Sequence, residues 1–402
     1  MKSFNHNILF TFELCLFYNI NAFKKYTTLI KRLIVISAIL LNFLSIQAQK
    51  YIVFVGSYNK DKTNEGIYVY ELDPVSGVLT RQSSVRNIMN PSFLTLSANG
   101  KYLYACSETQ MPNAGSVSGF AFNKETRTLS FINSQKSGGD NPAFCSLSKN
   151  GKWIVNANYS GGSVAVHPLA EDGTIKPSAQ VIVYTDRSVV KERQDMSHIH
   201  SSVFSPDFRY IFLPDLGADK IRTYRFDDAQ AKPLQPVKVP FTKTVAGSGP
   251  RHFTFHPNGK FAYCIEELSG TIDIFKYLNG TLDKIQRIAT HTAQIKDGFG
   301  SADIHISPDG KFLYASNRGA ENNIAIFSIK PDGTLKTVGY QSTLGNHPRN
   351  FSLDPTGKFL IVANMNSGDI VVFKRNSKTG LLTKTGSEVK VSSPSCIVIR
   401  KY

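Results

Sequence analysis

Two charged residue pairs bracket one short stretch of the sequence, GPRHFTFHPNGKFAYCIEELSG, which runs from Gly249 to Gly270. Arg251-His252 opens its first apolar segment, and Glu266-Glu267 closes its second. The alternating aromatic residues predict two strands joined by a turn at 256–259. Arginine binds anions, whereas histidine and glutamate exchange protons. The stretch therefore offers anion binding and acid–base chemistry, provided that the fold brings its two ends together.

The same pattern recurs along the chain, and this recurrence predicts the fold. Similar stretches of alternating apolar residues begin about 50 residues apart, a period that suits a propeller blade. They begin at Asn90, Asn141, His198, Gly249, Gly300 and His347. Each continues into a third apolar strand, a turn with Gly-Thr-Leu or Gly-Leu-Leu, and a more polar fourth strand. Each unit is therefore expected to be a sheet of four antiparallel strands.

The two ends of the chain supply a seventh unit. Residues 51–58 match a second strand, and residues 66–73 with the following Gly-Val-Leu segment match a third and a fourth. The C-terminal stretch SPSCIVIRK has the pattern of the missing first strand. We therefore predict an all-β, seven-bladed β-propeller over residues 49–402, in which the C-terminal strand pairs with the N-terminal blade. This closure leaves no open sheet edge.

Propeller geometry brings the charged pairs together. The first strand of each blade lines the channel and the second runs antiparallel beside it, so the start of one meets the end of the other at one mouth. Charged residues at these positions gather in four adjacent units, whereas the apolar positions repeat around the ring. A structural role would repeat, so the uneven cluster predicts a ligand site. Its candidate members are His198, His200, Asp215, Arg251, His252, Glu267, Asp303, His305, Asn317, Arg318 and Arg349.

Simpler roles remain open for individual members of this cluster. His198 and His200 lie two apart on a strand and face the same way, as a structural pair does. Arg349 can neutralise a neighbouring carboxylate, and the asparagines can cap turns. A metal site is a further alternative, because imidazole and carboxylate groups bind divalent ions. Its ligands would come from His198, His200, His252, His305, Asp215 and Asp303, although no spacing motif supports it.

The N-terminal region predicts export. Lys31-Arg32 precedes the apolar run LIVISAILLNFLSI, and Ile46-Gln47-Ala48 provides a small-residue cleavage site. We interpret residues 1–48 as an N-terminal extension and signal peptide that is cleaved near Ala48. The apolar run is too short for a stable membrane anchor. We expect the cleaved chain to lie outside the cytoplasm, in the periplasm.

Charge and cysteine content narrow the class of partner. The formal net charge is +16, but Lys and Arg are scattered through the turns, without a basic run interleaved with aromatic residues. This distribution argues against nucleic-acid binding and favours attraction of a small anion. The four cysteines beyond the leader show no Cys-x-x-Cys spacing, so we expect buried free thiols. They are Cys106, Cys145, Cys264 and Cys396.

Polar motifs, in addition to the repeats, carry a resemblance to a known family. They are FVGSY (54–58), GIYVYELD (66–73), NPAF (141–144), HIHSSVFSPD (198–207), PDLGADKI (214–221), GSGPRHFTFHPNGK (247–260), ADIHISPDGKFLYASNRG (302–319) and PRNFSLDPTGKFLIVAN (348–364). Across residues 51–402 the chain resembles the lactonase propeller family, which includes seven-bladed 6-phosphogluconolactonases and carboxymuconate-cyclising enzymes. The resemblance implies that a lactone ring is opened or closed at the channel mouth.

The resemblance also implies roles for individual residues. The family's catalytic histidine, arginine and glutamate fall on His200, Arg251 and Glu267, and a further arginine is expected from a neighbouring blade, at position 318 or 349. Two features depart from the family pattern. Glu266 stands where the family often has asparagine, and the predicted export differs from the usual cytosolic location of phospholactone hydrolases. The second departure leaves open whether the substrate is phosphorylated.

Hydrolysis of a sugar-type lactone is the chemistry that the residues favour. It needs an activated water and a stabilised oxyanion. His200 or Glu267 can take the proton of the water, and Arg251 can stabilise the oxyanion or hold a substrate carboxylate or phosphate. Arg318 and Arg349 can anchor the anionic end of the substrate. The sequence contains no Gly-x-Ser-x-Gly elbow, which would indicate a serine nucleophile. It also contains no motif that would indicate a cofactor. The alternatives are a muconate-type lactonising isomerase and a non-catalytic propeller that binds a ligand or partner.

Overall fold

The computed structural model describes residues 50–109 and 112–402, together with Thr27 and Lys31. Apart from those two residues, the predicted extension and signal peptide lie outside the described residues, so cleavage near Ala48 stays a prediction. Residues Lys50–Tyr402 form one compact unit. Every regular element in the described part of this unit is a β-strand. No helix among the described residues is long and apolar enough to cross a membrane.

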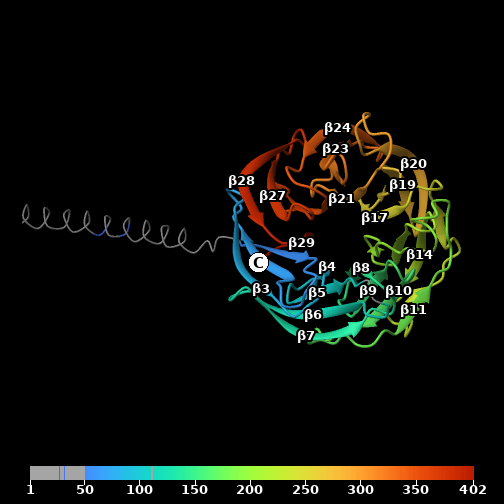
Figure 1. Ribbon diagram of the computed structural model, residues 1–402, viewed down its shortest axis with the longest axis horizontal. Coiled ribbons are helices and arrows are strands. Elements are labelled where there is room, and N and C mark those ends of the chain that lie inside the picture. The colour runs from blue at the N-terminus through green and yellow to red at the C-terminus, as the bar shows by residue number, and fades with distance from the viewer. Residues whose placement is uncertain (1–26, 28–30, 32–49, 110–111) are drawn as a thin grey trace, which may run out of the picture. The chain divides into compact units, whose positions relative to one another are not determined.

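The described strands form seven antiparallel sheets that stand side by side around a central axis (Figure 1). Blade 1 comprises, in spatial order, β29 (Pro394–Lys401), β1 (Tyr51–Ser57), β2 (Ile67–Leu72) and β3 (Leu79–Val85). Blade 2 comprises β4 (Pro91–Leu96), β5 (Tyr102–Ser107), β6 (Ser116–Asn123) and β7 (Thr128–Lys136). Blade 3 comprises β8 (Pro142–Leu147), β9 (Trp153–Asn158), β10 (Ser163–Pro168) and β11 (Gln180–Val183).

The remaining four blades follow in chain order. Blade 4 comprises β12 (Val203–Phe204), β13 (Tyr210–Asp215), β14 (Lys220–Phe226), β15 (Leu234–Gln235) and β16 (Phe241–Lys243). Blade 5 comprises β17 (Pro250–Phe255), β18 (Phe261–Glu266), β19 (Thr271–Leu278) and β20 (Thr281–Ala289). Blade 6 comprises β21 (Ser301–Ile306), β22 (Phe312–Asn317), β23 (Asn323–Ile329) and β24 (Leu335–Ser342). Blade 7 comprises β25 (Pro348–Leu353), β26 (Phe359–Asn364), β27 (Asp369–Arg375) and β28 (Leu382–Lys390). The prediction of a seven-bladed propeller is confirmed.

The hydrophobic core lies between neighbouring blades. Successive side chains of a strand point to opposite faces, and β18 shows the consequence. Phe261, Tyr263 and Ile265 pack in a cluster shared with blade 6, whereas Ala262 and Cys264 pack in a cluster shared with blade 4. Both faces of the second strand are therefore buried, which explains its nearly continuous apolar sequence.

The C-terminal strand closes the ring as predicted. β29 pairs antiparallel with β1, and the register places Val55 opposite Ile397 and Tyr51 opposite Lys401. The first blade is thus assembled from both ends of the propeller domain. In the other blades the first strand directly precedes the second strand in the chain. In blade 1 the C-terminal strand β29 takes the place of that first strand, so the inner edge of β1 is paired.

A β-bulge at the start of the first strand sets the position of two arginines. In blade 5, Pro250 pairs with Glu266 and His252 with Ile265, so Arg251 is the extra residue. Arg349 is the extra residue at the equivalent point of blade 7. A bulge redirects the side chain of its extra residue and increases the local twist. Both guanidinium groups are therefore placed by backbone geometry at the same end of their strands.

Blade 4 departs from the expected pattern. Its first strand is expected from His198, but β12 covers only Val203–Phe204. Upstream of β12, a single bridge joins Ile199 to Asp215. Two backbone hydrogen bonds, from His200 N–H to the carbonyl of Pro214 and from Leu216 N–H to the carbonyl of His198, continue the contact. Ser201 Oγ donates to the carbonyl of Arg251 in the neighbouring blade 5 at 2.9 Å. The irregular connection 184–202 between β11 and β12 carries the candidates His198 and His200, together with Arg193, which bonds to Glu267.

Candidate active site

The residues that directly follow the second strands form the wall of one large cavity. They are Tyr58, Glu108, Tyr159, Leu216, Glu267, Arg318 and Met365, one from each blade. All of these except Leu216 line a cavity of about 850 Å³ in the described part of the chain. Equivalent backbone positions of successive blades face the same mouth. A column of residues in the sequence therefore becomes a ring in space.

A second ring lines a small adjoining cavity. Its members occupy the starts of the first strands, and they are Ser92, Ala143, His200, Arg251, Ala302, Arg349 and Ser395. All except Ala302 line a cavity of about 10 Å³ among the described residues, together with Phe93, His252 and Asn350. Ala143, His200 and Arg349 line both cavities. These three residues therefore form the partition between the large and the small cavity.

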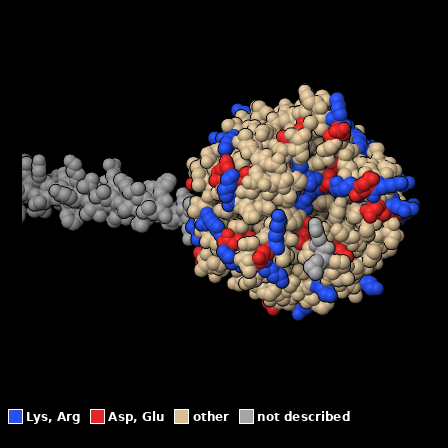
Figure 2. Space-filling model, in the orientation of Figure 1, with Lys and Arg blue, Asp and Glu red and all other residues tan. Residues whose placement is uncertain are grey.

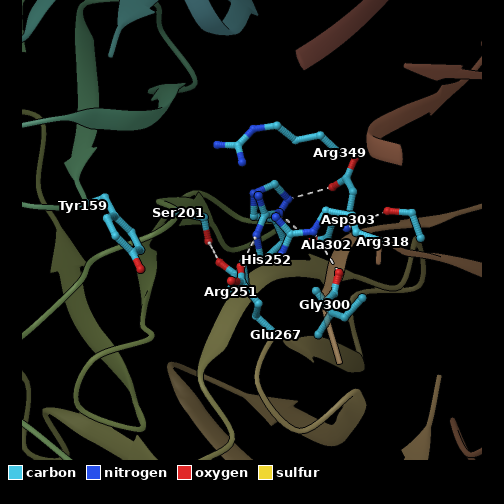
Figure 3. A network of polar contacts seen from close by, with 12 residues as sticks. Tyr159, Ser201, Arg251, His252, Glu267, Gly300, Ala302, Asp303, Arg318 and Arg349 are labelled. Atoms are coloured by element: carbon cyan, nitrogen blue, oxygen red, sulfur yellow. Dashed lines mark hydrogen bonds and ion pairs between the residues drawn. The ribbon is translucent and has the colours of Figure 1, made fainter. Parts of the chain in front are cut away.

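Glu267 is the centre of a cluster of arginines (Figure 3). Its Oε2 accepts a hydrogen bond from Arg251 Nε at 2.9 Å and lies 2.9 Å from Arg318 Nη2. Its Oε1 accepts from Arg193 Nη2 at 2.6 Å. Burial disfavours the ionised carboxylate, but Arg318 and Arg251 outweigh burial and hold the pKa of Glu267 well below its ordinary value. Such a carboxylate keeps its charge and is a weak proton acceptor.

Arg251 lies behind Glu267 rather than on the wall of the large cavity. Its side chain is only 1% exposed, and its Nη1 donates to the carbonyl of Ala302 at 2.6 Å. Burial and the Arg318 guanidinium lower the pKa of Arg251 to about 9, which is still above neutral pH. Arg251 is therefore a buried cation that reaches the large cavity through Glu267.

His200 stands in the partition between the two cavities. Its side chain is buried, and its Nδ1 has no hydrogen-bond partner within the described residues. The ring centroid lies 5.2 Å from that of Tyr159 and 5.3 Å from that of His252. Burial, followed by the charge of Arg251, lowers the pKa of His200 well below 6.5. The imidazole is therefore neutral at physiological pH, and one ring nitrogen can accept a proton.

Asp303 gathers three polar side chains beside the small cavity. Its Oδ1 lies 2.7 Å from His252 Nδ1, and its Oδ2 lies 2.9 Å from His305 Nε2. Asn350 Nδ2 donates to Oδ2 at 2.5 Å. Burial would raise the pKa of Asp303, but His305 and the hydrogen bond from His252 hold it well below its ordinary value. Burial, followed by the charge of Arg251, lowers the pKa of His252 to about 4.

Arg349 and Glu108 form a second arginine–carboxylate pair on the wall of the large cavity. Arg349 Nη2 lies 3.4 Å from Glu108 Oε1, and Ser92 Oγ donates to the same oxygen at 2.7 Å. The Arg349 guanidinium also lies over the ring of Tyr58, 5.2 Å from its centroid. Burial alone would lower the pKa of Arg349, but Tyr58 and Glu108 raise it above its ordinary value. Arg349 is therefore a permanent cation at the cavity wall.

Charge is distributed differently on the surface and in the cavity. Figure 2 shows basic and acidic side chains interspersed over one face of the propeller. The described wall of the large cavity, in contrast, has more cations than carboxylates. The cations are Lys60, Arg193, Arg318 and Arg349, and the carboxylates are Glu108 and Glu267. This surplus favours the entry of a polar or anionic ligand.

Comparison with known proteins assigns this arrangement to a family. The model of the family described as "Lactonase, 7-bladed beta-propeller" matches residues 52–399. The chain belongs to this lactonase family. The match covers nearly all of the propeller, so the family resemblance noted on the polar motifs is confirmed.

Individual members of the lactonase family are similar over the whole propeller. A 6-phosphogluconolactonase of Formosa agariphila is 44% identical over 354 residues, which cover 87% of this chain and 99% of that protein. A 6-phosphogluconolactonase of Bacillus subtilis is 33% identical over 351 residues, which cover 87% of this chain and 98% of that protein. The solved structure of a periplasmic gluconolactonase from Pseudomonas aeruginosa has a TM-score of 0.83 at 37% identity, and the match covers 88% of this chain and 99% of that chain.

The candidate residues of this lactonase separate into three groups. Those that line the large cavity are His200, Glu267, Arg318 and Arg349. Arg251 and His252 line only the small cavity; Asp303 and His305 line neither cavity but belong to this group, because Asp303 is bonded to His252 and His305 is bonded to Asp303. The other candidates that line neither cavity are His198, Asp215 and Asn317. The structure thus brings most of the predicted cluster together, in two layers.

In the third group, Asp215 and Asn317 bond to the backbone and line neither of these two cavities. Asp215 accepts from Arg222 Nη2 at 2.7 Å and from the backbone N–H of His198 at 2.9 Å. Asn317 donates to the carbonyl of Thr290 at 2.6 Å. Asp215 and Asn317 end their strands, one residue before the ring position, so their side chains point between blades. The metal alternative gains no support, since no three His, Cys, Asp or Glu side chains converge as a metal site among the described residues.

Sequence reasoning missed several residues of the cavity wall. Tyr58, Glu108 and Tyr159 occupy the ring position of Glu267 in other blades. The repeats in the sequence already place them at the ring position of Glu267, but selection by charge in four adjacent units left them out of the candidate set. Arg193 lies in the irregular connection before β12. No repeat covers that connection, so no sequence signal pointed to Arg193.

Proposed function

We propose that this chain is a hydrolase that opens the ring of a sugar lactone with water at the mouth of the propeller. The observation that carries the proposal is the neutral His200, which lines the same cavity as the ionised Glu267 and two cations, Arg318 and Arg349. Addition of water to a carbonyl requires a proton acceptor beside fixed positive charge. The wall of the large cavity provides both.

The reaction starts from a water molecule between His200 and the lactone carbonyl. His200 takes one proton from this water as the water oxygen bonds to the carbonyl carbon. Arg318 and Arg349 stabilise the oxyanion that forms. The bond between the carbonyl carbon and the ring oxygen then breaks, and the imidazolium of His200 returns its proton to the ring oxygen. The product is the open hydroxy acid.

Glu267 and Arg251 act by charge and position in this scheme. Glu267 is assigned the electrostatic role because three arginines bind its carboxylate and hold it ionised, with its pKa well below the ordinary value. It fixes Arg318 and Arg193 at the cavity wall and balances the charge of Arg251. Arg251 in turn contributes to keeping His200 neutral. Arg251 is therefore a positioning residue, because it lines only the small cavity.

The substrate we propose is a small, polar or anionic sugar lactone. The relatives named above are 6-phosphogluconolactonases, and the structural neighbour is a gluconolactonase. The surplus of cations on the cavity wall suits a ligand that is anionic or rich in hydroxyl groups. Arg193 and Lys60, which line this wall, are the residues assigned to the far end of the substrate.

Export is the second part of the proposal. We assign residues 1–48 to an extension and signal peptide and residues 49–402 to the secreted propeller domain. The similarity to a periplasmic gluconolactonase supports this location. A periplasmic location favours the unphosphorylated lactone over the phosphorylated one. N-terminal sequencing of natively expressed protein tests it: a start near Gln49 is expected, and an uncleaved chain in the cytosol would overturn export.

A lactone panel tests the activity. Glucono-δ-lactone, its 6-phosphate and a muconate are supplied at a pH where spontaneous hydrolysis is slow, and acid release is followed. We expect hydrolysis of a sugar lactone that falls by about 10²–10⁴-fold in His200→Gln, the range for a general base. His256→Gln is the matched control, because His256 lies in the turn after β17 and bonds to the carbonyl of Gly310. Conversion of the muconate alone, or no turnover at all, would overturn the proposal.

A further inference from the structure

We propose that His252 and Asp303 are positioning residues for His200, and that they act through one water molecule bound in the small cavity. The inference rests on the proposed function only in that His200 is the proton acceptor. It gives the water a specific task, which is to fix the ring nitrogen of His200 that carries the proton.

The small cavity has the size and the polar wall of a water site. Its volume is about 10 Å³, which is room for about one water molecule. Ser92, Ser395 and Asn350 contribute polar groups to its wall, in addition to His200 and His252. A buried water typically makes about three hydrogen bonds. The two serine hydroxyls already donate their protons, to Glu108 and to backbone carbonyls, but their oxygens can still accept. One such oxygen and the ring nitrogens of His200 and His252 provide three partners.

The Nδ1 atom of His200 needs a partner of this kind. It is buried, and no atom of the described residues is hydrogen-bonded to it. Nearly all buried polar atoms in proteins are bonded to protein or to ordered water. The ring lines both cavities. With Nδ1 as the buried nitrogen, Nε2 is the nitrogen that serves the large cavity.

Asp303 determines which nitrogen of His252 is protonated. His252 Nδ1 lies 2.7 Å from Asp303 Oδ1, and an ionised carboxylate only accepts hydrogen bonds. Nδ1 of His252 therefore carries the proton, and Nε2 carries a lone pair. His252 also lines the small cavity, and its ring centroid lies 5.3 Å from that of His200. A water in this cavity is therefore shared by both rings.

The hydrogen bonds of this water then have a fixed direction. The water donates to Nε2 of His252 and accepts from Nδ1–H of His200. Nε2 of His200 is left with its lone pair toward the large cavity, which is the tautomer that a general base needs. In Ser-His-Asp hydrolases a buried aspartate orients the histidine directly. Here Asp303 performs the same task across His252 and one water.

His305 provides a matched control. It bonds to Asp303 through Oδ2 at 2.9 Å, whereas His252 uses Oδ1. Among the described residues, the wall of the small cavity includes His252 but not His305. The substitution His305→Gln therefore leaves the contact between His252 and Asp303 in place but removes a neighbour that helps to keep Asp303 ionised, so it is the milder of the two changes.

Kinetics of the full-length protein give the first test. Asp303→Asn and His252→Gln are expected to lower kcat for a sugar lactone by about 10²-fold, the lower end of what a general base supplies. KM should stay close to the wild-type value, because neither residue lines the large cavity. His305→Gln should lower kcat by less than His252→Gln does. Equal losses in all three variants, or a change confined to KM, would overturn the inference.

A second test needs no turnover and separates this inference from the proposed function. ¹⁵N NMR of the wild-type protein reports which ring nitrogen of His200 is protonated, and a crystal structure with ordered solvent locates the water. We expect a proton on Nδ1 and a water within hydrogen-bond distance of both rings. A proton on Nε2, or no water between His200 and His252, would overturn the inference even in an active enzyme. The expected tautomer in a protein without lactone hydrolysis would overturn the proposed function alone.

Discussion

The Nε atom of Arg251 lies 2.9 Å from Oε2 of Glu267, and both side chains are buried. Arg251 is the extra residue of the bulge in β17, and Glu267 directly follows β18 in the same blade. Removal of one partner from a buried ion pair leaves the other charge uncompensated, which costs more than the intact pair contributes. The pair therefore belongs both to the stability of the mouth and to the candidate active site.

Replacing Arg251 with alanine is expected to reduce stability and turnover together. Loss of one partner of a buried pair costs about 3–5 kcal/mol in the free energy of unfolding. We expect kcat to fall as well, because Glu267 loses one of the cations that balance it and His200 loses a charge that keeps it neutral. Arg222→Ala is the control, because it breaks the buried pair with Asp215 outside both cavities. The positioning role of Arg251 fails if both variants lose the same turnover per folded molecule.

Glu267→Gln tests the charge of the carboxylate without changing its shape. The neutral amide weakens the hold on Arg251, Arg318 and Arg193, so we expect lactone turnover to fall by about 10²-fold or more. Glu266→Gln is the adjacent control, since Glu266 pairs with Arg287 at 2.9 Å and does not line the described cavity wall. The measurement is the initial rate of lactone hydrolysis by each of the two variants. Equal rates would show that the carboxylate at position 267 has no special role.

The pH dependence of stability provides a separate prediction for Glu266. Burial, followed by the neighbouring Asp273, raises the pKa of Glu266 from 4.5 to about 7 in the folded protein. A raised pKa means that the folded protein favours neutral Glu266. The contribution of this neutral side chain to the free energy of unfolding is complete below pH 4.5 and is lost as the pH rises through 7. Glu266→Gln should remove this loss, on the order of 3 kcal/mol above pH 7. Melting curves of both proteins at pH 5 and pH 8 measure the difference, and parallel curves would contradict it.

The fold could be predicted because its determinants repeat in the sequence. The two-residue alternation along β18 decides which side chains face each neighbouring blade, and the same alternation recurs in every second strand. The closure of β29 on β1 follows from the same pattern, because the C-terminal stretch supplies the first strand that the N-terminal unit lacks. Neither inference depended on details of loop geometry.

The candidate site could be predicted as a ring but not as a set of contacts. Glu267 and Arg318 follow their second strands and reach the cavity, whereas Asp215 and Asn317 end theirs and do not. A shift of one residue turns a strand side chain to the opposite face. Charge clustering in the sequence did not distinguish these two positions.

Two further features depended on local backbone geometry that the alternation of apolar residues does not encode. Burial of Arg251 follows from the bulge between Pro250 and His252, which the alternation rule alone does not reveal. The contact of Arg193 with Glu267 depends on the path of the irregular connection 184–202. Bulges and irregular connections often place functional side chains, so these were the features that the sequence pattern left undetermined.

Truncation tests the closure of the ring. Deletion of residues 393–402 removes β29 and exposes the hydrogen-bonding edge of β1. We expect loss of the cooperative melting transition, or a large fall in melting temperature together with aggregation. Deletion of residues 401–402 alone is the control, because it leaves Val55 paired with Ile397. A long truncation that melts like the full chain would contradict the observed closure.

Arg193 offers the sharpest test of the cavity wall, because its role can be separated from stability. Its side chain is 43% exposed and lines the large cavity, and an exposed ion pair contributes only about 0–1 kcal/mol to stability. A charged hydrogen bond to substrate is worth about 1.5–3 kcal/mol, so Arg193→Ala should weaken kcat/KM by about 10–100-fold. Lys191→Ala is the control, since Lys191 is an exposed cation of the same connection. Unchanged kcat/KM in Arg193→Ala, with both variants melting normally, would remove Arg193 from the substrate site.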